Sequence, residues 1–533
     1  MKGSELFIQS LKNQGVKYIF GIVGREAKSI LFDDPNIKFI LTRHEFTAGI
    51  MAEVYARLTG RPQILFSTFG PGATNIVTPV ASSYLDKSPM LTISAQVEKY
   101  DVNYNYTHQC VDQVSILKPI TKYAKEIYSV KEIPEIIHKA FRATQLLPPG
   151  PSFVSIPFDL FDQEIDKQQA INLLKKYNYL NKKTVNYPNK KIIKKAHKLI
   201  MEAKHPIILV GNAVIREKAT DELKNFVEKW NIPVVLTFGG KGAIPENHPL
   251  YIGTINKYLS YFLKFDVNQT IFSKVDVILT IGYDYAENTE PSQWTIGEKK
   301  KIINISSFSN TDKKLFNPDI NIIGDIKTTL RELIKHNIDK KKKLDFSIFK
   351  NKLEKFLKSK GPQNIITTIR KVLGKDGILI SDIGLHKQYA GLFSATYYPN
   401  TFLCSNGLGT FGFSLPAAMA AKLFYPKRKI IAVCGDGGFH SISHDLETAV
   451  RYNLPIICVI FKDNCFGLIK HYQKEGHHKT NPEVVDFGKV DFIKLAQANG
   501  CVGYKASISN LKVVLKKAIN LSQPCVIEVP IKY

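Results

Sequence analysis

Apolar and polar positions along the chain follow two alternating patterns. Short, nearly continuous apolar runs, typical of buried strands, are separated by longer stretches with the apolar spacing of one helix face. In the first third of the chain the runs are KYIFGIVG from Lys17, KFILTR from Lys38, QILFSTFG from Gln63 and PMLTISAQ from Pro89. Strands that alternate with helices in this way predict a parallel α/β architecture.

Two stretches rich in lysine and asparagine interrupt the alternation, at about Gln168 to Lys190 and about His336 to Asp345. They divide the chain into three blocks, which we predict as domains at residues 1–167, 191–335 and 351–533. The middle block has strand-like runs of its own, HPIILVG, IPVVLTF and VDVILTIG. A chain of 533 residues is also too long for one hydrophobic core. We therefore expect an α/β protein with three doubly wound parallel-sheet domains.

The charge of the chain changes this picture little. The formal net charge is +26 at pH 7, but the lysines are scattered, and the one dense run, Lys340 to Lys343, lies in a predicted linker. This distribution argues against a nucleic-acid partner, although a basic surface would attract phosphorylated substrates. No apolar run is long enough to span a bilayer, and the first residues turn polar at once, so we expect a cytoplasmic protein with no membrane partner. The seven cysteines lack metal-ligand spacing, which favours buried free thiols.

An acid between glycines is the first chemical signal. Asp436 follows the apolar run KIIAVC and lies among Gly435, Gly437 and Gly438, before a predicted helix. The next strand, LPIICVIF, ends shortly before Asp463. Both acids would lie at the carboxyl ends of parallel strands, where ligands bind, and the glycines would let the backbone approach a bulky anion. An aspartate beside a diphosphate is favourable if a divalent ion such as Mg²⁺ lies between them; the alternative is an ordinary strand-to-helix turn.

This segment resembles the diphosphate motif of thiamine-diphosphate enzymes, a Gly-Asp-Gly followed about 27 residues later by a second metal ligand. The resemblance implies thiamine diphosphate and Mg²⁺ as cofactors, with Asp436 as the first metal ligand. The second position falls on Asp463, where the family usually has asparagine, so either Asp463 or the adjacent Asn464 is the ligand. The backbone carbonyl of Cys465 would be the third ligand, and His386 would contact the cofactor.

The first block carries the complementary half of the motif. Glu45 ends a strand and opens a helix in RHEFTAGIMAEVYARLTG, and it resembles the family's catalytic glutamate, whose carboxyl shares a proton with the cofactor's pyrimidine ring. The alternative is a favourable charge near the helix dipole. By the same resemblance, Pro71 and Asn75 in GPGATN contact the cofactor, as do Gly409 and Phe411 in NGLGTFGF; Phe411 has a core position as its alternative. The resemblance also implies pairing between chains, in at least a homodimer and, we expect, a homotetramer.

The substrate-facing stretches are most similar to those of carboxyethylarginine synthases. They include GIVGREAKSILFDD, THQCVDQ, TIGYDYAE and GHHKTNPEV, and they are spread over all three blocks. The resemblance implies a synthase that converts glyceraldehyde 3-phosphate, a phosphorylated triose, and a basic amino acid such as L-arginine to an N-(2-carboxyethyl) amino acid with release of phosphate.

Five further residues receive roles from this resemblance. His108 and Gln109 would move protons or bind intermediates, since histidine titrates near neutrality. Lys387 and Gln388 stand where we expect an arginine–histidine pair, and lysine can hold a phosphate as a point charge. Tyr283, with Asp284 and Glu287 nearby, would contact the basic acceptor amino acid; a structural strand-end turn is the alternative.

Two other functions fit the same motifs. An acetolactate synthase, or a related enzyme that condenses or decarboxylates 2-oxo acids such as pyruvate, would share RHE, GPGATN and the GLGT segment. We place it second because this chain has THQC where that group usually has Phe-Gln-Glu, has KDNCFG where it has an Asn-Asn-Glu pattern, and lacks a clear flavin-binding signature. A non-catalytic homologue is disfavoured by the presence of Glu45 and Asp436.

Overall fold

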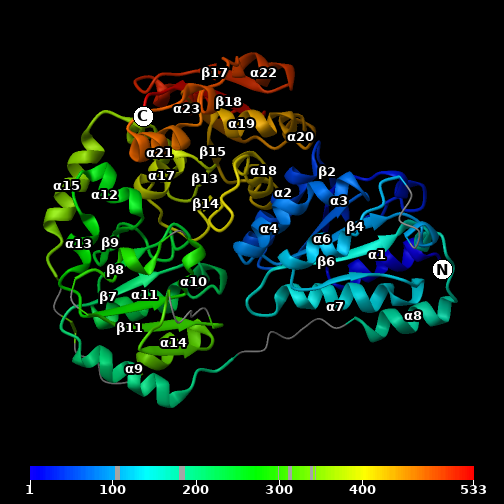
Figure 1. Cartoon of the computed structure of the whole chain (residues 1–533), viewed down its shortest axis with the longest axis horizontal. Coiled ribbons are helices and arrows are strands. Elements are labelled where there is room, and N and C mark those ends of the chain that lie inside the picture. Colours follow the sequence, from blue (N-terminus) through cyan, green and yellow to red (C-terminus); the bar gives the residue numbers. More distant parts are fainter. Residues whose placement is uncertain are drawn as a thin grey trace. The chain divides into compact units, whose positions relative to one another are not determined.

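The computed structural model describes residues 1–102, 108–178, 186–287, 289–297, 299–309, 315–335, 340–341 and 344–533 (Figure 1). The chain forms two compact units. The first comprises Met1–Lys183, Leu408–Pro426 and Ile442–Leu454, and the second comprises Thr184–Gly407, Lys427–Ser441 and Pro455–Tyr533. Each unit is described by itself.

The first unit is built on a six-stranded parallel sheet in the order β2-β1-β3-β4-β6-β5. Its strands are β1 (Tyr18–Gly21), β2 (Lys38–Leu41), β3 (Gln63–Ser67), β4 (Met90–Gln96), β5 (Ala124–Glu126) and β6 (Pro151–Pro157). Helices α1 (Gly3–Asn13) and α7 (Ile133–Gln145) pack together and share a core with the sheet, while α2 (Glu45–Thr59) packs against α4 (Val77–Leu85) and β3. Every residue of β3 and β4 is buried, as expected of strands covered on both faces.

The first part of the chain has four further helices, three of them short, and the unit also includes two helices from late in the sequence. They are α3 (Pro71–Asn75), α5 (Lys99–Val102), α6 (Gln113–Leu117), α8 (Lys167–Lys176), α18 (Ser414–Phe424) and α20 (Leu446–Arg451). Helix α18 packs closely against α2.

The second unit contains two sheets, both parallel and six-stranded. The middle sheet has the order β12-β11-β10-β7-β8-β9. Its strands are β7 (Pro206–Val210), β8 (Val234–Leu236), β9 (Tyr251–Thr254), β10 (Val277–Ile281), β11 (Lys301–Ser306) and β12 (Ile320–Ile323). The accompanying helices are α9 (Lys190–Glu202), α10 (Ala213–Arg216), α11 (Thr220–Trp230), α12 (Lys257–Leu263), α13 (Val267–Phe272) and α14 (Ile326–Leu333).

The third sheet has the order β14-β13-β15-β16-β18-β17. Its strands are β13 (Ile378–Ser381), β14 (Phe402–Cys404), β15 (Ile430–Gly435), β16 (Ile457–Lys462), β17 (Val502–Lys505) and β18 (Cys525–Pro530). The helices of this part are α15 (Ser347–Lys358), α16 (Pro362–Leu373), α17 (Leu385–Phe393), α19 (Asp436–Ile442), α21 (Gly467–His477), α22 (Phe492–Ala498) and α23 (Leu511–Ala518). Strands β15 and β16 are neighbours, so their carboxyl ends meet at one edge.

The predicted fold class is confirmed, because the three blocks form three parallel sheets with flanking helices. The domain boundaries at 1–167, 191–335 and 351–533 stay predictions. The first expected linker is partly wrong: α8 begins at Lys167, since Asp166 accepts a capping hydrogen bond from the Gln169 N–H and Ala170 packs into the core. Residues 179–185 of that linker, and 336–339 and 342–343 of the second, lie outside the described residues.

Two expectations from composition concern the whole chain. All seven cysteines are free thiols, and six of them are buried, with Cys110 in an intermediate position. Within the part of the chain that the structure describes, no helix is both long enough and apolar enough to cross a membrane.

Candidate active site

Asp436 connects the carboxyl ends of two neighbouring strands. It begins α19 directly after β15 and is 1% exposed. Its Oδ1 accepts the N–H of Gly437 at 2.9 Å, and its Oδ2 accepts the N–H groups of Asp463 at 3.1 Å and Asn464 at 2.7 Å. Burial raises the pKa of Asp436, and these backbone hydrogen bonds oppose that shift. The structure therefore brings together the two turns that the sequence separates.

The second acid lies beside the first in this loop. Cys465 donates its thiol to Asp463 Oδ2 at 3.2 Å. Burial is the main cause that raises the pKa of Asp463 to about 6, and the negative charge of Asp436 contributes. Asn464 has a φ of 55° in the left-handed region, and its backbone N–H and carbonyl bond to Asp436 and Phe487. Asp463 thus presents its carboxylate near Asp436, while Asn464 contributes its backbone.

His386 provides a buried polar atom next to the same glycine turn. It lies in the first turn of α17, is 2% exposed, and packs near Phe461. A Cβ added to Gly435 would lie 3.3 Å from His386 Cε1. Burial lowers the pKa of His386 to about 3, so the ring is neutral, and its Nε2 has no hydrogen-bond partner among the described residues. A buried polar atom without a partner, next to a glycine turn at the end of a strand, is available to a bound ligand.

Lys387 and Gln388 follow on the same helix and are buried. The Lys387 ammonium donates to the backbone carbonyl of Ser405 at 2.7 Å, so it is held inside the protein. Gln388 Oε1 has no partner among the described residues. Of this pair, Gln388 keeps an open hydrogen-bonding group, whereas Lys387 is engaged by its own chain.

In the first unit, Glu45 and Asn75 form a pair. Glu45 is the first residue of α2 and is 8% exposed, and its Oε2 accepts a hydrogen bond from Asn75 Nδ2 at 3.0 Å. His44, the cap of α2, accepts the Phe46 N–H on its ring nitrogen, so the helix start does not depend on the glutamate for capping. The Glu45 carboxylate is therefore buried and oriented by an amide from α3.

The Gly-Pro-Gly turn has a clear steric reason. Gly70 has a φ of 61°, and a Cβ there would lie 2.5 Å from the Cβ of Gln109. Pro71 is the first residue of α3, the position in a helix where its missing N–H costs nothing. Gln109 also has a positive φ, 65°, and the preceding His108 is exposed. The structure thus places the predicted Gln109 against the predicted glycine turn.

The GLGTFGF segment exposes its aromatic ring. Phe411 is 52% exposed, which removes the alternative that it is a core residue. Gly409 has a φ of 69°, a conformation that favours glycine.

The expectation for Tyr283 is wrong. Its ring is 1% exposed, packs edge-to-face on Trp294 and Phe316, and donates its hydroxyl to the carbonyl of Thr289. A side chain enclosed in this way belongs to the core and cannot contact a bound amino acid. Glu287 is likewise buried, and its carboxylate bonds to groups of its own chain: it accepts the Asn212 N–H at 2.7 Å and the Thr237 hydroxyl.

Sequence reasoning missed two groups that shape these turns. Asp445 is fully buried and accepts the Arg43 N–H at 2.8 Å, two residues before Glu45, so it positions the entry to α2. Tyr533 stacks on Tyr389 at a centroid distance of 6.0 Å, and a Cβ on Gly467 would lie 3.3 Å from its ring. Both contacts join residues far apart in the sequence, and no local pattern signals them.

The donor set fits thiamine diphosphate with Mg²⁺. Two carboxylates at the ends of adjacent strands suit an ion that keeps phosphate oxygens as further ligands. Across the described ranges, no group of three or more histidine, cysteine, aspartate or glutamate side chains is arranged to hold a metal, so the ion would need such additional ligands. The partnerless Nε2 of His386 beside Gly435 leaves a polar atom that a bound cofactor can contact.

Comparison with known families agrees with this geometry. Residues 1–116 match the family described as "Thiamine pyrophosphate enzyme, N-terminal TPP binding domain", residues 193–333 match its central domain, and residues 382–529 match its C-terminal TPP binding domain. The chain belongs to the thiamine pyrophosphate enzymes, and its cofactors are thiamine diphosphate and Mg²⁺.

Individual proteins similar to this chain point to one group within the thiamine pyrophosphate enzymes. An acetolactate synthase of Bacillus subtilis (strain 168) is 30% identical, with 100% of this chain and 93% of that protein covered. A probable acetolactate synthase large subunit of Methanocaldococcus jannaschii is 34% identical, with 100% and 92% covered. Acetolactate synthase isozyme 3 large subunit of Escherichia coli (strain K12) is 29% identical, with 95% and 90% covered.

The prediction of a carboxyethylarginine synthase is wrong. The similarity to proteins named acetolactate synthase extends over the whole chain, whereas the prediction rested on short loops such as THQC and GYDYAE. The glyceraldehyde 3-phosphate donor and the basic acceptor amino acid are withdrawn with it. So is the phosphate-binding role of Lys387, whose ammonium already bonds to Ser405.

Proposed function

We propose that this protein catalyses an acetolactate synthase-like reaction, in which one 2-oxo acid such as pyruvate loses CO₂ and its remaining carbons join the carbonyl carbon of a second 2-oxo acid. With pyruvate in both positions, the products are acetolactate and CO₂. The observation that carries the proposal is similarity to acetolactate synthases along the full chain, including both halves of the candidate site.

Two metal-binding side chains and one carbonyl would anchor the cofactor. Asp436 and Asp463 would bind Mg²⁺ together with the backbone carbonyl of Cys465, and the ion would bridge to the diphosphate. Asp463 is preferred over Asn464 because its carboxylate lies near Asp436. Gly435, Gly437 and Gly438 would allow the diphosphate to approach the backbone. His386 would contact the diphosphate region of the cofactor through its partnerless Nε2.

The bound cofactor supplies a carbon nucleophile that also accepts the electron pair left by loss of CO₂. Glu45 would hold and move a proton at the cofactor's aminopyrimidine ring, and Asn75 orients the carboxylate through its 3.0 Å hydrogen bond. Pro71, Gly409 and Phe411 would contact the cofactor's rings.

Three residues would face the reacting atoms and bind substrate or move protons there. His108 and Gln109 lie on the segment that packs against the Gly70 turn and would bind substrate or move protons. Gln388, with its partnerless Oε1, would bind the substrate from α17.

An assay of products tests the reaction. The purified protein with thiamine diphosphate and Mg²⁺ is given pyruvate, and CO₂ and acetolactate are measured together. We expect one CO₂ per acetolactate, and formation of both products slowed about 100-fold or more in Glu45→Gln. Formation of CO₂ without acetolactate would replace the proposal with simple decarboxylation. If neither product forms, the proposal is refuted.

We also propose that two chains form each site, in at least a homodimer, with Glu45 from one chain and Asp436 from the other. Complementation tests this arrangement. Glu45→Gln and Asp436→Ala chains, each inactive, are mixed under conditions that exchange subunits. Random pairing should restore about a quarter of the wild-type activity, because half of the dimers then have one intact site. If each chain forms its own site, the mixture stays inactive.

A further inference from the structure

A cavity lies in the first unit, at the opposite end of the sheet from Glu45. Its volume is about 670 Å³, within the range of small-molecule sites. Its lining includes Lys17, which precedes β1, and Gln63, which begins β3, so it opens at the amino ends of the strands. Glu45 and Pro71 instead follow the carboxyl ends of β2 and β3. The cavity is therefore separate from the proposed catalytic groups.

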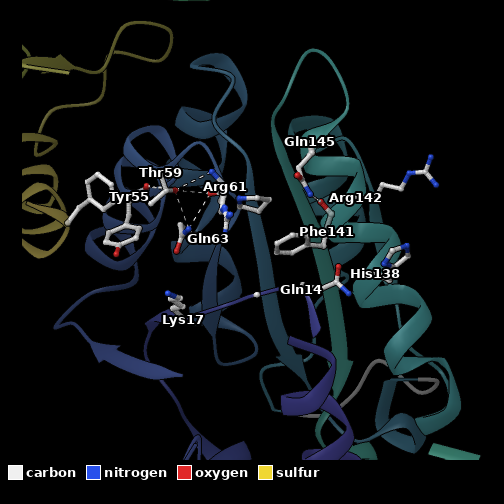
Figure 2. Close-up of a pocket in the computed structure, with 13 residues that line it drawn as sticks. Gln14, Lys17, Tyr55, Thr59, Arg61, Gln63, His138, Phe141, Arg142 and Gln145 are labelled. Atoms are coloured by element: carbon white, nitrogen blue, oxygen red, sulfur yellow. Dashed lines mark hydrogen bonds between the residues drawn. The ribbon is translucent and has the colours of Figure 1, made fainter. Parts of the chain in front are cut away.

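Two walls enclose the cavity. Figure 2 shows Tyr55, Thr59, Arg61 and Gln63 on one side and α7 on the other, with the ring of Phe141 pointing into the space between them. Phe424 of α18 also lines it, so three aromatic rings contribute apolar surface. Flat rings on facing walls suit a planar apolar group.

The charge of the lining has one sign. Lys17, Arg61 and Arg142 line the cavity with His138, and no aspartate or glutamate does. Within the residues that the structure describes, no carboxylate lies within ion-pair distance of the side chains of Lys17 or Arg61. Arg142, on α7, extends away from Phe141 in Figure 2. Lys17 and Arg61 are therefore the cations that we consider for a ligand in the cavity. Uncompensated cations that line one cavity favour an anionic ligand.

The amides restrict the ligand further. Gln14, Gln63 and Gln145 line the cavity and supply amide oxygens as acceptors, and Gln14 and Gln145 each have a second amide hydrogen beyond the one donated to the carbonyls of Tyr177 and Phe141. Gln63 is held in place, since its Nε2 donates to Thr59 Oγ1 and to the Arg61 carbonyl. An inorganic anion would leave most of the volume and all of the rings unused. A ligand with a planar, hydrogen-bonding ring and a multiply charged tail uses every wall.

We propose that this cavity binds a nucleoside di- or triphosphate, with its phosphates on Lys17 and Arg61 and its base between the aromatic walls. The proposal goes beyond the proposed reaction and does not depend on it. Helix α2 begins at Glu45 and reaches the cavity at Tyr55 and Thr59, so an occupant would contact the same helix that carries the proposed catalytic carboxylate.

Calorimetric titration of ADP into the protein saturated with thiamine diphosphate and Mg²⁺ tests the site. We expect one ADP per chain, and affinity about tenfold weaker in Lys17→Glu and in Arg61→Glu, because each loses a charge-assisted contact. Both residues are exposed, so the variants should fold, which circular dichroism would check. Lys131→Glu, an exposed lysine outside the cavity, is the matched control and should bind ADP like the wild type.

Two comparison ligands test which chemical class of ligand the cavity binds. Adenosine and pyrophosphate should each bind more weakly than ADP. The proposal is overturned if the wild type shows no binding at millimolar ADP, if Lys17→Glu and Arg61→Glu bind like the control, or if pyrophosphate binds as tightly as ADP.

Discussion

Glu287 makes the stability of the middle sheet depend on pH. The side chain is buried at the carboxyl end of that sheet, where its carboxylate accepts the N–H of Asn212 at 2.7 Å and the hydroxyl of Thr237. Burial raises its pKa from the ordinary value of 4.5 to about 8, more than these hydrogen bonds lower it. Because the folded pKa lies above the unfolded one, the folded state holds an extra proton between these values. The free energy of unfolding therefore falls as the pH rises through this window.

The size of the effect follows from the same two values. The interval from 4.5 to about 8 corresponds to about 5 kcal/mol of stability, fully present below the unfolded pKa and fully lost above the folded one. Over an accessible range of about pH 6 to pH 9, roughly 2–3 kcal/mol of it should disappear. Glu287→Gln keeps the shape of the side chain, an acceptor for Asn212 and a polar contact to Thr237, and it cannot ionise.

Tryptophan fluorescence selectively reports the unfolding of the middle sheet. The only two tryptophans, Trp230 and Trp294, both lie in the region of the middle sheet, so their emission during urea unfolding reports on it. The wild type should lose stability from pH 6 to pH 9 relative to Glu287→Gln, while Glu290→Gln, an exposed glutamate nearby, should follow the wild type. Parallel curves for wild type and Glu287→Gln would refute the reasoning.

Three further changes have defined outcomes. Glu45→Gln should slow hydrogen–deuterium exchange at the thiazolium C2 of bound thiamine diphosphate by about 100-fold or more, measured by NMR, because the proton-transfer group is lost. Asp436→Asn should weaken Mg²⁺-dependent cofactor binding by about tenfold or more in calorimetry, since an amide cannot accept N–H bonds on both of its heavy atoms. Glu246→Ala should lower the free energy of unfolding, followed by tryptophan fluorescence, by about 3–5 kcal/mol, because it leaves the buried Lys241 ammonium without its carboxylate.

Each of these three predictions has an outcome that would contradict it, and the third also has a control variant. Unchanged C2 exchange in Glu45→Gln, with the cofactor still bound, would remove its proposed role. Equal cofactor affinity in Asp436→Asn and wild type would remove Asp436 from the metal site. The double change Lys241→Met with Glu246→Met should recover much of the stability lost in Glu246→Ala; if the single change costs nothing, the pair is not the buried interaction described.

The architecture and the acids of the site were predictable from the sequence. Periods of strand and helix are local properties of the chain, and the apolar runs from Lys17 and Gln63 became β1 and β3. The turn at Asp436 could be placed at a strand end because it directly follows the apolar run KIIAVC, which forms most of β15. The error over substrate came from loops, whose short sequences vary while the scaffold around them stays the same.

Tertiary structure alone decided how these groups are held. That Asp436 accepts the backbone of Asp463 and Asn464, that Asn75 orients Glu45, and that Tyr283 is enclosed by Trp294 are contacts between distant segments. The sequence determined which side chains stand at the ends of strands, because that depends on local periodicity. Which of them are buried, bonded or open depends on how separate segments pack, and that information is present only in the folded chain.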